Sequence, residues 1–229
     1  MEKVTIIIPV KDEEEGLRFL IDDFQESSLK EKYLVRFIFV IDNRTSDSSR
    51  SVASELSEEI IDQKDTTGKG AAIRQAVDSW KMDPTPLVVF LDADGSYSFD
   101  SVLGIIERLE KGSDVVSGSR FLSQKGRPEG MGRLHNFGNH LLSAVSSLRN
   151  ARRISDLCTG LWGFREDSLN KIVIKSNGFD LEAEIAGLCR KNRLTHTEIP
   201  VSWSQRKGGT SKLRSLTDGS IILLRILIT

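Results

Sequence analysis

The sequence predicts an α/β fold with a mostly parallel central sheet covered by helices on both faces. Apolar, β-branched runs of strand length recur along the chain, and segments with helical periodicity separate them. Continuous apolar runs are typical of strands that are buried on both faces of a parallel sheet. The regular alternation of the two kinds of segment indicates crossover connections between parallel strands.

The N-terminal half supplies the first strands and helices. The first strand is expected at residues 4–10, a run that reaches charge again at Lys11 and is too short for a signal peptide or a spanning helix. Further strands are expected at residues 35–41, 87–91 and 114–119. Helical periodicity predicts helices between them at residues 14–26, 46–58, 70–81 and 101–111.

The C-terminal half begins with a Gly/Pro-rich stretch at residues 126–132, where we expect a mobile loop. The pattern then predicts a helix at 133–149, a strand at 161–165, a helix at 181–191 and a strand at 195–203. A Gly/Lys loop leads to an amphipathic segment at residues 213–229, shorter than the roughly 20 residues that a membrane span requires. We expect one domain at residues 1–212 and a terminal segment that lies in a membrane interface or packs on the core.

Charge and cysteine content exclude several classes of protein. Lys and Arg number 32 against 33 Asp and Glu, so the net charge of -1 gives no general attraction for nucleic acid, and phosphate binding must be local. Cys158 and Cys189 have neither zinc-site spacing nor a disulfide framework. We therefore expect a chain of a reducing compartment, without a nucleic-acid partner.

Asp92 and Asp94 follow the apolar run at residues 87–91, where an open α/β sheet binds ligands. Two carboxylates this close repel each other unless a cation lies between them. Mg²⁺ or Mn²⁺, with its other positions filled by phosphate and water, suits such a pair. The competing interpretation is a cap for the next helix, but the position after a buried strand favours the metal.

Two other strand ends carry polar residues suited to a nucleotide. Asp42 can accept hydrogen bonds from a base or ribose; the competing interpretation is a cap at Thr45, Ser46 or Asp47 for the next helix, and both can hold at once. Gly68–Lys69–Gly70 opens a helix, so backbone N–H groups and a lysine lie at its positive end. It is no Walker A loop, and a plain turn remains the alternative.

Several cations on predicted loops are candidate phosphate ligands, or else solvated surface charges. They are Arg120, Arg133, Arg206, Lys207 and Lys212.

In sequence order the chain contains the elements IIIPVKDEE, VIDNRTSD, GKGAA, LDADGSY, SGSRF, a Gly-rich loop with Arg133, DLCTGLWGFR, GFDLEAE, EIPVSW and GGTSKL. With these it resembles the family-2 glycosyltransferases, and within them the dolichyl-phosphate mannose synthase-like polyprenyl-phosphate glycosyltransferases. The resemblance covers almost the whole chain. It implies a GT-A fold with a Rossmann-like nucleotide-binding half.

The resemblance also implies roles for residues of this chain. The metal would be held by Asp92 and Asp94, with Ser96 where the family often has Gln or His. The acceptor phosphate would be bound by Arg120, Arg133 and Asn136, the last where Ser is common. The nucleotide-sugar pocket would comprise Pro9, Lys11, Glu13, Ile41, Asp42, Asn43, Lys69, Asp92, Ala93, Arg206 and Lys212. The catalytic set would be Asp94, Arg120, Asp156 and Glu184, with Glu182 beside it.

The activity implied is inverting transfer of a sugar from a nucleoside-diphosphate donor, GDP-mannose or a UDP-sugar, to dolichyl or polyprenyl phosphate. A phosphate monoester has a second pKa of about 6, so the acceptor is already largely dianionic and needs no general base. The lipid would place the chain peripherally on the cytoplasmic face of a membrane, through residues 133–149 and 213–229. Arg149, Arg152 and Arg153 would meet anionic headgroups.

Three alternatives remain open at this point. The same fold can act on a water-soluble acceptor. A sugar-nucleotide pyrophosphorylase would have a Gly-rich basic loop where this chain has PVKDEE, and a non-catalytic scaffold would not need Asp92 and Asp94. The oligomeric state is not predicted.

Overall fold

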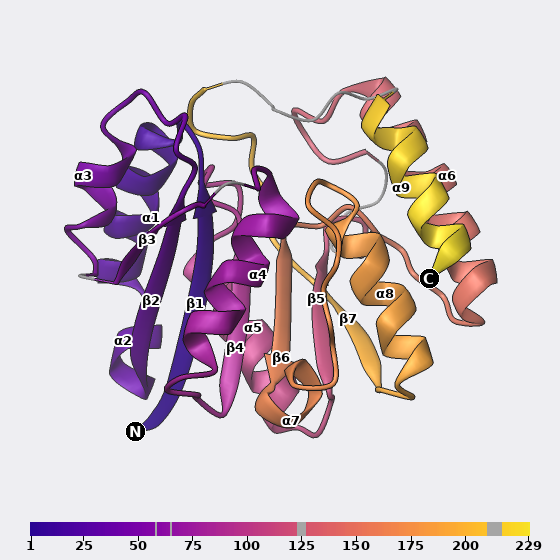
Figure 1. Cartoon of the computed structure of the whole chain (residues 1–229), viewed down its shortest axis with the longest axis horizontal. Helices are drawn as coiled ribbons and strands as arrows, with labels where there is room; N and C mark the ends of the chain where they lie inside the picture. Colours follow the sequence, from indigo (N-terminus) through magenta and orange to yellow (C-terminus); the bar gives the residue numbers. More distant parts are fainter. Residues whose placement is uncertain (58, 65, 123–126, 210–216) are drawn as a thin grey trace.

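The computed structural model describes residues 1–57, 59–64, 66–122, 127–209 and 217–229 (Figure 1). Its centre is a sheet of seven strands in the order β3-β2-β1-β4-β6-β5-β7. Among the strands of the described residues only β6 runs antiparallel to its neighbours, which confirms the predicted α/β class with a mostly parallel sheet. The strands are β1 (Glu2–Val10), β2 (Tyr33–Ile41), β3 (Ile60–Asp62), β4 (Leu87–Leu91), β5 (Val115–Ser119), β6 (Leu161–Arg165) and β7 (His196–Pro200).

Helices cover both faces of this sheet. They are α1 (Glu14–Glu26), α2 (Leu29–Lys32), α3 (Ser49–Ala53), α4 (Lys69–Trp80), α5 (Phe99–Glu110), α6 (Arg133–Asn150), α7 (Glu166–Leu169), α8 (Leu181–Lys191) and α9 (Thr217–Ile228). Side chains alternate across the pleat of β1, so Ile6 and Ile8 join the core beneath α1 and α5. Ile7 joins the other core, beneath α4 and α8.

The crossovers change faces on the two sides of β1. Helices α1 and α3, which flank β2 in the chain, pack on one face, and α4, which leads into β4, packs on the other. In a doubly wound sheet such a change opens a crevice at the carboxyl ends of the strands on either side. Here those ends are Val10 of β1 and Leu91 of β4, just before the polar residues of the sequence motifs.

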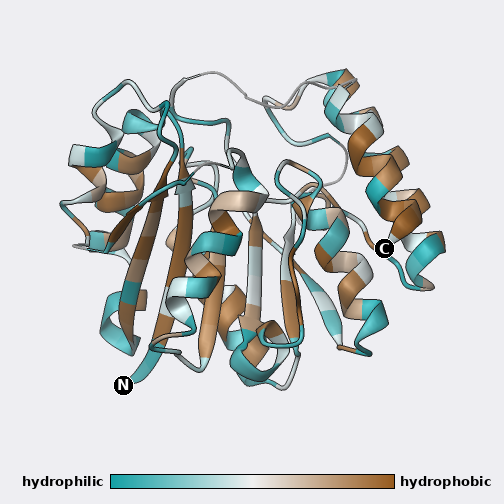
Figure 2. Cartoon of the chain, viewed as in Figure 1, coloured by the Kyte–Doolittle hydropathy of each residue, from teal (hydrophilic) through white to brown (hydrophobic). Residues whose placement is uncertain are grey.

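Helices α6 and α9 pack against each other at one end of the sheet, beside α8 (Figure 1). The buried positions of α6 are polar: Asn139, Ser143, Ser146 and Asn150. Its exposed positions include Leu134, Phe137, Leu141 and Leu148, and α9 likewise exposes leucines and isoleucines (Figure 2). Among the described residues, no helix is both long and apolar enough to cross a membrane.

Most elements lie where the sequence predicts them, apart from the short helices α2 and α7, which are not predicted, and three further differences. The helix expected at residues 46–58 is reduced to α3, because Asp47 accepts hydrogen bonds from the backbone N and hydroxyl of Ser49, and short polar side chains compete with helical bonding. Strand β3 has three residues, too few to show a period, and was not predicted. The strand expected at 195–203 ends at Pro200, with Trp203 forming a bridge to Tyr97.

Candidate active site

Asp92 follows β4 directly and is paired with Lys69, the first residue of α4. The Lys69 Nζ lies 2.6 Å from Oδ1 of Asp92 and 2.7 Å from Oε1 of Glu182, in the first turn of α8. The Glu182 side chain is 8% exposed and the Lys69 side chain 13%. A single ammonium therefore bridges two carboxylates that come from opposite halves of the chain.

The charge of Lys69 is fixed by its partners. Burial alone would lower the pKa of Lys69, but the carboxylates of Asp92 and Glu182 outweigh this effect and raise the pKa above its ordinary value. Burial raises the pKa of both carboxyl groups, and Lys69 opposes that rise. The site thus keeps a cation next to the first aspartate of the Asp92-Ala93-Asp94 triplet.

The Asp92-Ala93-Asp94 triplet lies between α1 and the segment that follows β7. The carbonyl of Asp94 accepts the backbone N–H of Lys207 at 3.0 Å, and its Oδ1 accepts the N–H of Ser96 at 3.0 Å. A Cβ at Gly16 would lie 2.3 Å from the carbonyl oxygen of Ala93, so α1 approaches this turn as only glycine allows. The backbone around Asp94 is therefore held on two sides.

Two further carboxylates at strand ends are bound by guanidinium groups. Glu13 accepts Nη2 of Arg206 at 2.5 and 2.6 Å, which joins the end of β1 to the segment after β7. Asp42, after β2, is buried and accepts Nε of Arg44 at 2.9 Å and Nη2 at 2.7 Å. The side chain of Arg44 lowers the pKa of Asp42, although burial opposes this effect. A base or ribose that binds Asp42 would compete with Arg44.

The remaining residues predicted for the nucleotide pocket also follow or end these strands. Pro9 and Ile41 close β1 and β2, Lys11 and Asn43 lie just beyond them, and Ala93 lies between the two aspartates. Lys212 falls outside the described residues. The described members of the predicted set therefore lie at or just beyond the ends of β1, β2 and β4, at the start of α4 and in the segment after β7.

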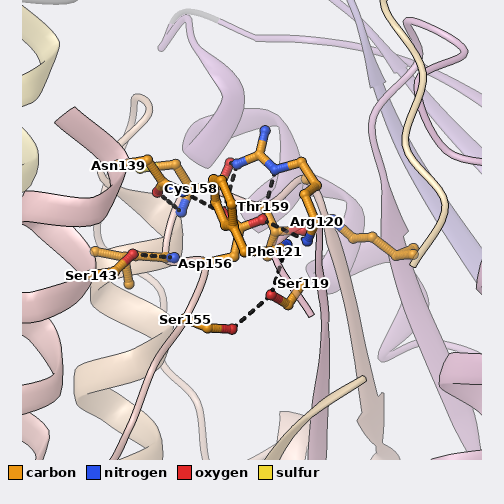
Figure 3. Close-up of polar contacts among 12 residues, drawn as sticks. Ser119, Arg120, Phe121, Asn139, Ser143, Ser155, Asp156, Cys158 and Thr159 are labelled. Atoms are coloured by element: carbon orange, nitrogen blue, oxygen red, sulfur yellow. Dashed lines mark hydrogen bonds and ion pairs between the residues drawn. The ribbon is translucent and has the colours of Figure 1, made fainter. Parts of the chain in front are cut away.

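A second charged centre lies at the end of β5 (Figure 3). Arg120 forms a bidentate ion pair with the fully buried Asp156, with Nε 2.6 Å from Oδ2 and Nη2 2.7 Å from Oδ1. Its backbone N–H also binds Oδ2, and Nη2 donates to the carbonyl of Cys158 at 2.9 Å. Burial would lower the pKa of Arg120, but Asp156 raises it, so this guanidinium is a fixed cation.

Two residues outside the predicted catalytic set hold Asp156 in place. Asn139 of α6 donates Nδ2 to Oδ1 of Asp156 at 2.7 Å and accepts the N–H of Cys158 at 3.1 Å. Glu198 of β7 accepts the backbone N–H groups of Ser155 and Asp156. The one sequence signal for Asn139 is its place in the polar stripe of α6, at helical spacing from Ser143.

The two centres are joined by the segment 156–160. Tyr97 OH lies 3.1 Å from the Thr159 hydroxyl and accepts the N–H of Gly160 at 3.2 Å. Gly160 in turn lies against the carboxylate of Asp92. A lysine centre and an arginine centre therefore lie along one edge of the sheet and share a connecting segment.

Comparison with known proteins identifies the chain. Residues 5–173 match the family model described as glycosyl transferase family 2. The chain belongs to glycosyltransferase family 2. It is 28% identical over 226 residues to glycosyltransferase AglJ of Haloferax volcanii, which covers 98% of this chain and 71% of that protein. It is 29% identical over 177 residues to a dolichyl-phosphate hexose transferase of the same organism, covering 77% of this chain and 73% of the relative.

A solved structure confirms the GT-A-like fold. This glycosyltransferase superimposes on the Mycobacterium tuberculosis glucosyl-3-phosphoglycerate synthase with a TM-score of 0.68, 15% identity and coverage of 99% of this chain and 79% of that one. That structure is a complex with Mn²⁺, UDP-glucose and phosphoglyceric acid. At this identity the likeness establishes the fold of the glycosyltransferase, and its ligands are properties of the neighbour.

The donor atoms of Asp92 and Asp94 fit a hard divalent cation. Both are carboxylates, the ligand type that Mg²⁺ and Mn²⁺ prefer. Among the described residues of the glycosyltransferase, no group of three or more His, Cys, Asp or Glu could hold a metal. A divalent cation here would be held by these two carboxylates, with substrate phosphates and water completing its shell.

Three predicted residues lie elsewhere in the glycosyltransferase. Glu184 accepts the backbone N–H groups of Lys175 and Ser176 at 2.9 and 2.8 Å, so its carboxylate caps a loop. Arg133 and Asn136 lie in the first turn of α6; Arg133 is exposed, and Oδ1 of Asn136 is buried without a hydrogen-bond partner in the described structure. An orphaned buried acceptor is expected where a ligand or solvent completes the bonding.

Proposed function

We propose that this glycosyltransferase moves a sugar from a nucleoside-diphosphate donor to polyprenyl phosphate, with inversion at the anomeric carbon. The observation that carries the proposal is a pair of fixed cations at one sheet edge: Lys69, held by Asp92 and Glu182, and Arg120, held by Asp156. One suits a diphosphate that leaves, and the other suits a phosphate that attacks. The segment 156–160 connects them.

The donor side is assigned to Asp92, Asp94 and Lys69. The two aspartates would hold Mg²⁺ or Mn²⁺, which when bound neutralises charge on the diphosphate. Lys69 supplies a second positive charge at the helix start, and it is preorganised because Asp92 and Glu182 already fix its ammonium. Mn²⁺ with UDP-glucose in the mycobacterial neighbour supports this assignment.

The acceptor side is assigned to Arg120, and Arg133 and Asn136, in the first turn of α6, are proposed as further contacts to the same phosphate. A guanidinium already held by Asp156 pays little ordering entropy when it binds a phosphate oxygen. A dianionic phosphate is a nucleophile without a general base. His196 therefore need not act as a general base. Burial lowers its pKa to about 3, and its ring is hydrogen-bonded to the Ser117 hydroxyl.

The lipid tail requires a surface next to the acceptor site, and α6 offers one. Its polar stripe faces the protein, with Asn139 bonded to Asp156, while Phe137 and Leu141 are 66% and 53% exposed. An apolar outer face of this kind lies in a membrane interface, and Arg149 at its end would meet anionic headgroups. We place this contact on a cytoplasmic membrane face, since Cys158 and Cys189 are free thiols. The dolichyl-phosphate hexose transferase relative supports a lipid phosphate acceptor.

A second candidate acceptor is a small water-soluble phosphate. The mycobacterial neighbour contains phosphoglyceric acid, and the Arg120 centre would suit its phosphate equally well. The exposed apolar face formed by α6 and α9 favours the lipid, since a small acceptor has no use for it.

The test is a transfer assay that separates the two acceptors. The enzyme is incubated with labelled GDP-mannose, UDP-glucose or UDP-N-acetylglucosamine, Mn²⁺, and either polyprenyl phosphate in vesicles or phosphoglyceric acid in solution. The proposal predicts label in the lipid phase, dependent on Mn²⁺ or Mg²⁺, and its loss in Asp94→Asn. Label that enters only the aqueous acceptor would replace the lipid with the second candidate.

A further inference from the structure

The C-terminal helix α9 is attached to the first turn of α8 by a partly buried arginine. Arg225 Nε lies 2.8 Å from Oδ2 of Asp180, and its Nη1 lies 3.5 Å from Oε1 of Glu184. The side chains of Asp180 and Glu184 are 6% and 4% exposed, and that of Arg225 is 22% exposed. The two helices also approach closely, since a Cβ at Gly187 would lie 2.7 Å from Thr229.

The first turn of α8 is connected to Lys69 through two sets of contacts. Directly, Glu182 accepts the Lys69 ammonium at 2.7 Å. Indirectly, Glu184 binds the N–H groups of Lys175 and Ser176, which begin the loop packed on the N-terminus of α4. In that loop the carbonyl of Asn177 accepts the N–H of Ala71 at 3.1 Å.

The loop that begins at Lys175 and Ser176 packs tightly against the start of α4. A Cβ at Gly70 would lie 2.5 Å from the carbonyl oxygen of Ser176, and Arg74 donates to the same carbonyl at 3.0 Å. A shift of the first turn of α8 would therefore move the Glu182 carboxylate, which holds the Lys69 ammonium. It would also move the loop that packs on the start of α4, where Lys69 lies. Only the contacts of Arg225 tie this turn to α9 through charged groups in the described structure.

We propose that Arg225 is a positioning residue for the donor site: by anchoring α9 to the first turn of α8 it holds Lys69 in place for the donor diphosphate. The inference rests on the proposed function in taking Lys69 as a diphosphate ligand. It makes α9, whose outer face is the proposed membrane contact, part of the structure that forms the donor pocket. Packing of α9 and donor binding would then be coupled, and by linkage each would favour the other.

The test measures nucleoside-diphosphate binding and needs no acceptor. Titration calorimetry with GDP and with UDP, each with Mn²⁺, is run on the whole chain as wild type and as Arg225→Ala. Mutations along such coupled networks change binding by roughly 0.5–2 kcal/mol, or about 2- to 30-fold, and we expect weakening in that range. The control is Arg190→Ala, which removes an arginine contact from the opposite end of α8 to the carbonyl of Thr229. It should leave nucleotide affinity unchanged.

A double-mutant cycle separates positioning from general destabilisation. If Arg225 acts through Lys69, Arg225→Ala should have little further effect in a Lys69→Ala background, so the two changes are not additive. Arg225→Lys keeps the charge without the bidentate fork and should recover part of the affinity; it also replaces Arg225→Ala if that variant does not fold. Additive effects, or equal nucleotide affinity in wild type and both Arg225 variants, would overturn the inference and leave the proposed function standing. If wild type binds neither GDP nor UDP, the proposed donor fails, and the inference with it.

Discussion

Gly160 lies against the Asp92 carboxylate so closely that a Cβ at position 160 would come within 1.8 Å of Oδ2. The atom it would meet is the end of a side chain, so the fold can survive the change while the carboxylate rotates. This glycine therefore sets the orientation of the first proposed metal ligand. It also lies at the end of the segment that runs back to Asp156.

We predict that Gly160→Ala leaves the protein folded and nearly inactive. The added methyl displaces the Asp92 carboxylate from Lys69, and misplacement of about 1 Å in an active site can cost about 100-fold in rate. Steady-state kinetics and circular dichroism check this. Gly219→Ala is the control, because nothing lies within 4 Å of a Cβ there and alanine suits a helix. Wild-type kinetics in Gly160→Ala would contradict the assignment of Asp92 as a metal ligand.

Asn139 gives a second prediction. Asn139→Ala removes two hydrogen bonds, one to Asp156 and one from the Cys158 N–H, so the Arg120 pair loses a support. An unsatisfied buried group costs about 1–3 kcal/mol, and we expect that loss of stability together with a raised KM for the acceptor. The matched control is Asn150→Ala, a buried amide on the same face of α6 that bonds to Ser146. If both variants raise the acceptor KM equally, Asn139 has no specific role.

The strand ends and their polar residues could be predicted because both depend on local pattern. The run at 87–91 is β4 with the same bounds, and the carboxyl ends of parallel strands necessarily meet at one edge of the sheet. The partners of those residues could not be predicted. Lys69 of α4 meets Glu182 of α8, and Arg225 meets Asp180, because packing of helices distant in sequence decides both contacts. Glu184 shows the same limit, since its acidic motif is visible in the sequence and its bonding to a loop is not.

His196 predicts how stability depends on pH. Burial lowers its pKa to about 3, whereas in the unfolded chain it titrates near its ordinary value of about 6.5. Between these values the unfolded state binds one proton more than the folded state, so stability falls as the pH falls. Because the ring stays neutral in the folded state, the free energy of unfolding should fall by about 2 kcal/mol between pH 7 and pH 5. Denaturant unfolding of wild type and His196→Gln at both pH values checks this; equal losses in the two proteins would contradict it.

The outer face of α6 gives a prediction about membranes. Phe137→Asp places a charge at a position that is 66% exposed, so folding should be little affected, while binding to anionic vesicles should weaken at least about 10-fold. Vesicle co-sedimentation measures this. Met82→Asp, at an exposed residue after α4, is the control and should bind as wild type does. Equal vesicle binding by all three proteins would exclude α6 as the contact.

The central claim is that a phosphate, activated by its own charge and held at Arg120, attacks the sugar. The most direct measurement compares transfer of a labelled sugar to polyprenyl phosphate with transfer to the matching polyprenol, in the same vesicles and with the same donor. The two lipids differ only in the phosphate, so the account predicts labelled lipid from polyprenyl phosphate and none from the alcohol. Comparable transfer to the alcohol would contradict it, because that acceptor requires a general base and leaves the Arg120 centre without its ligand.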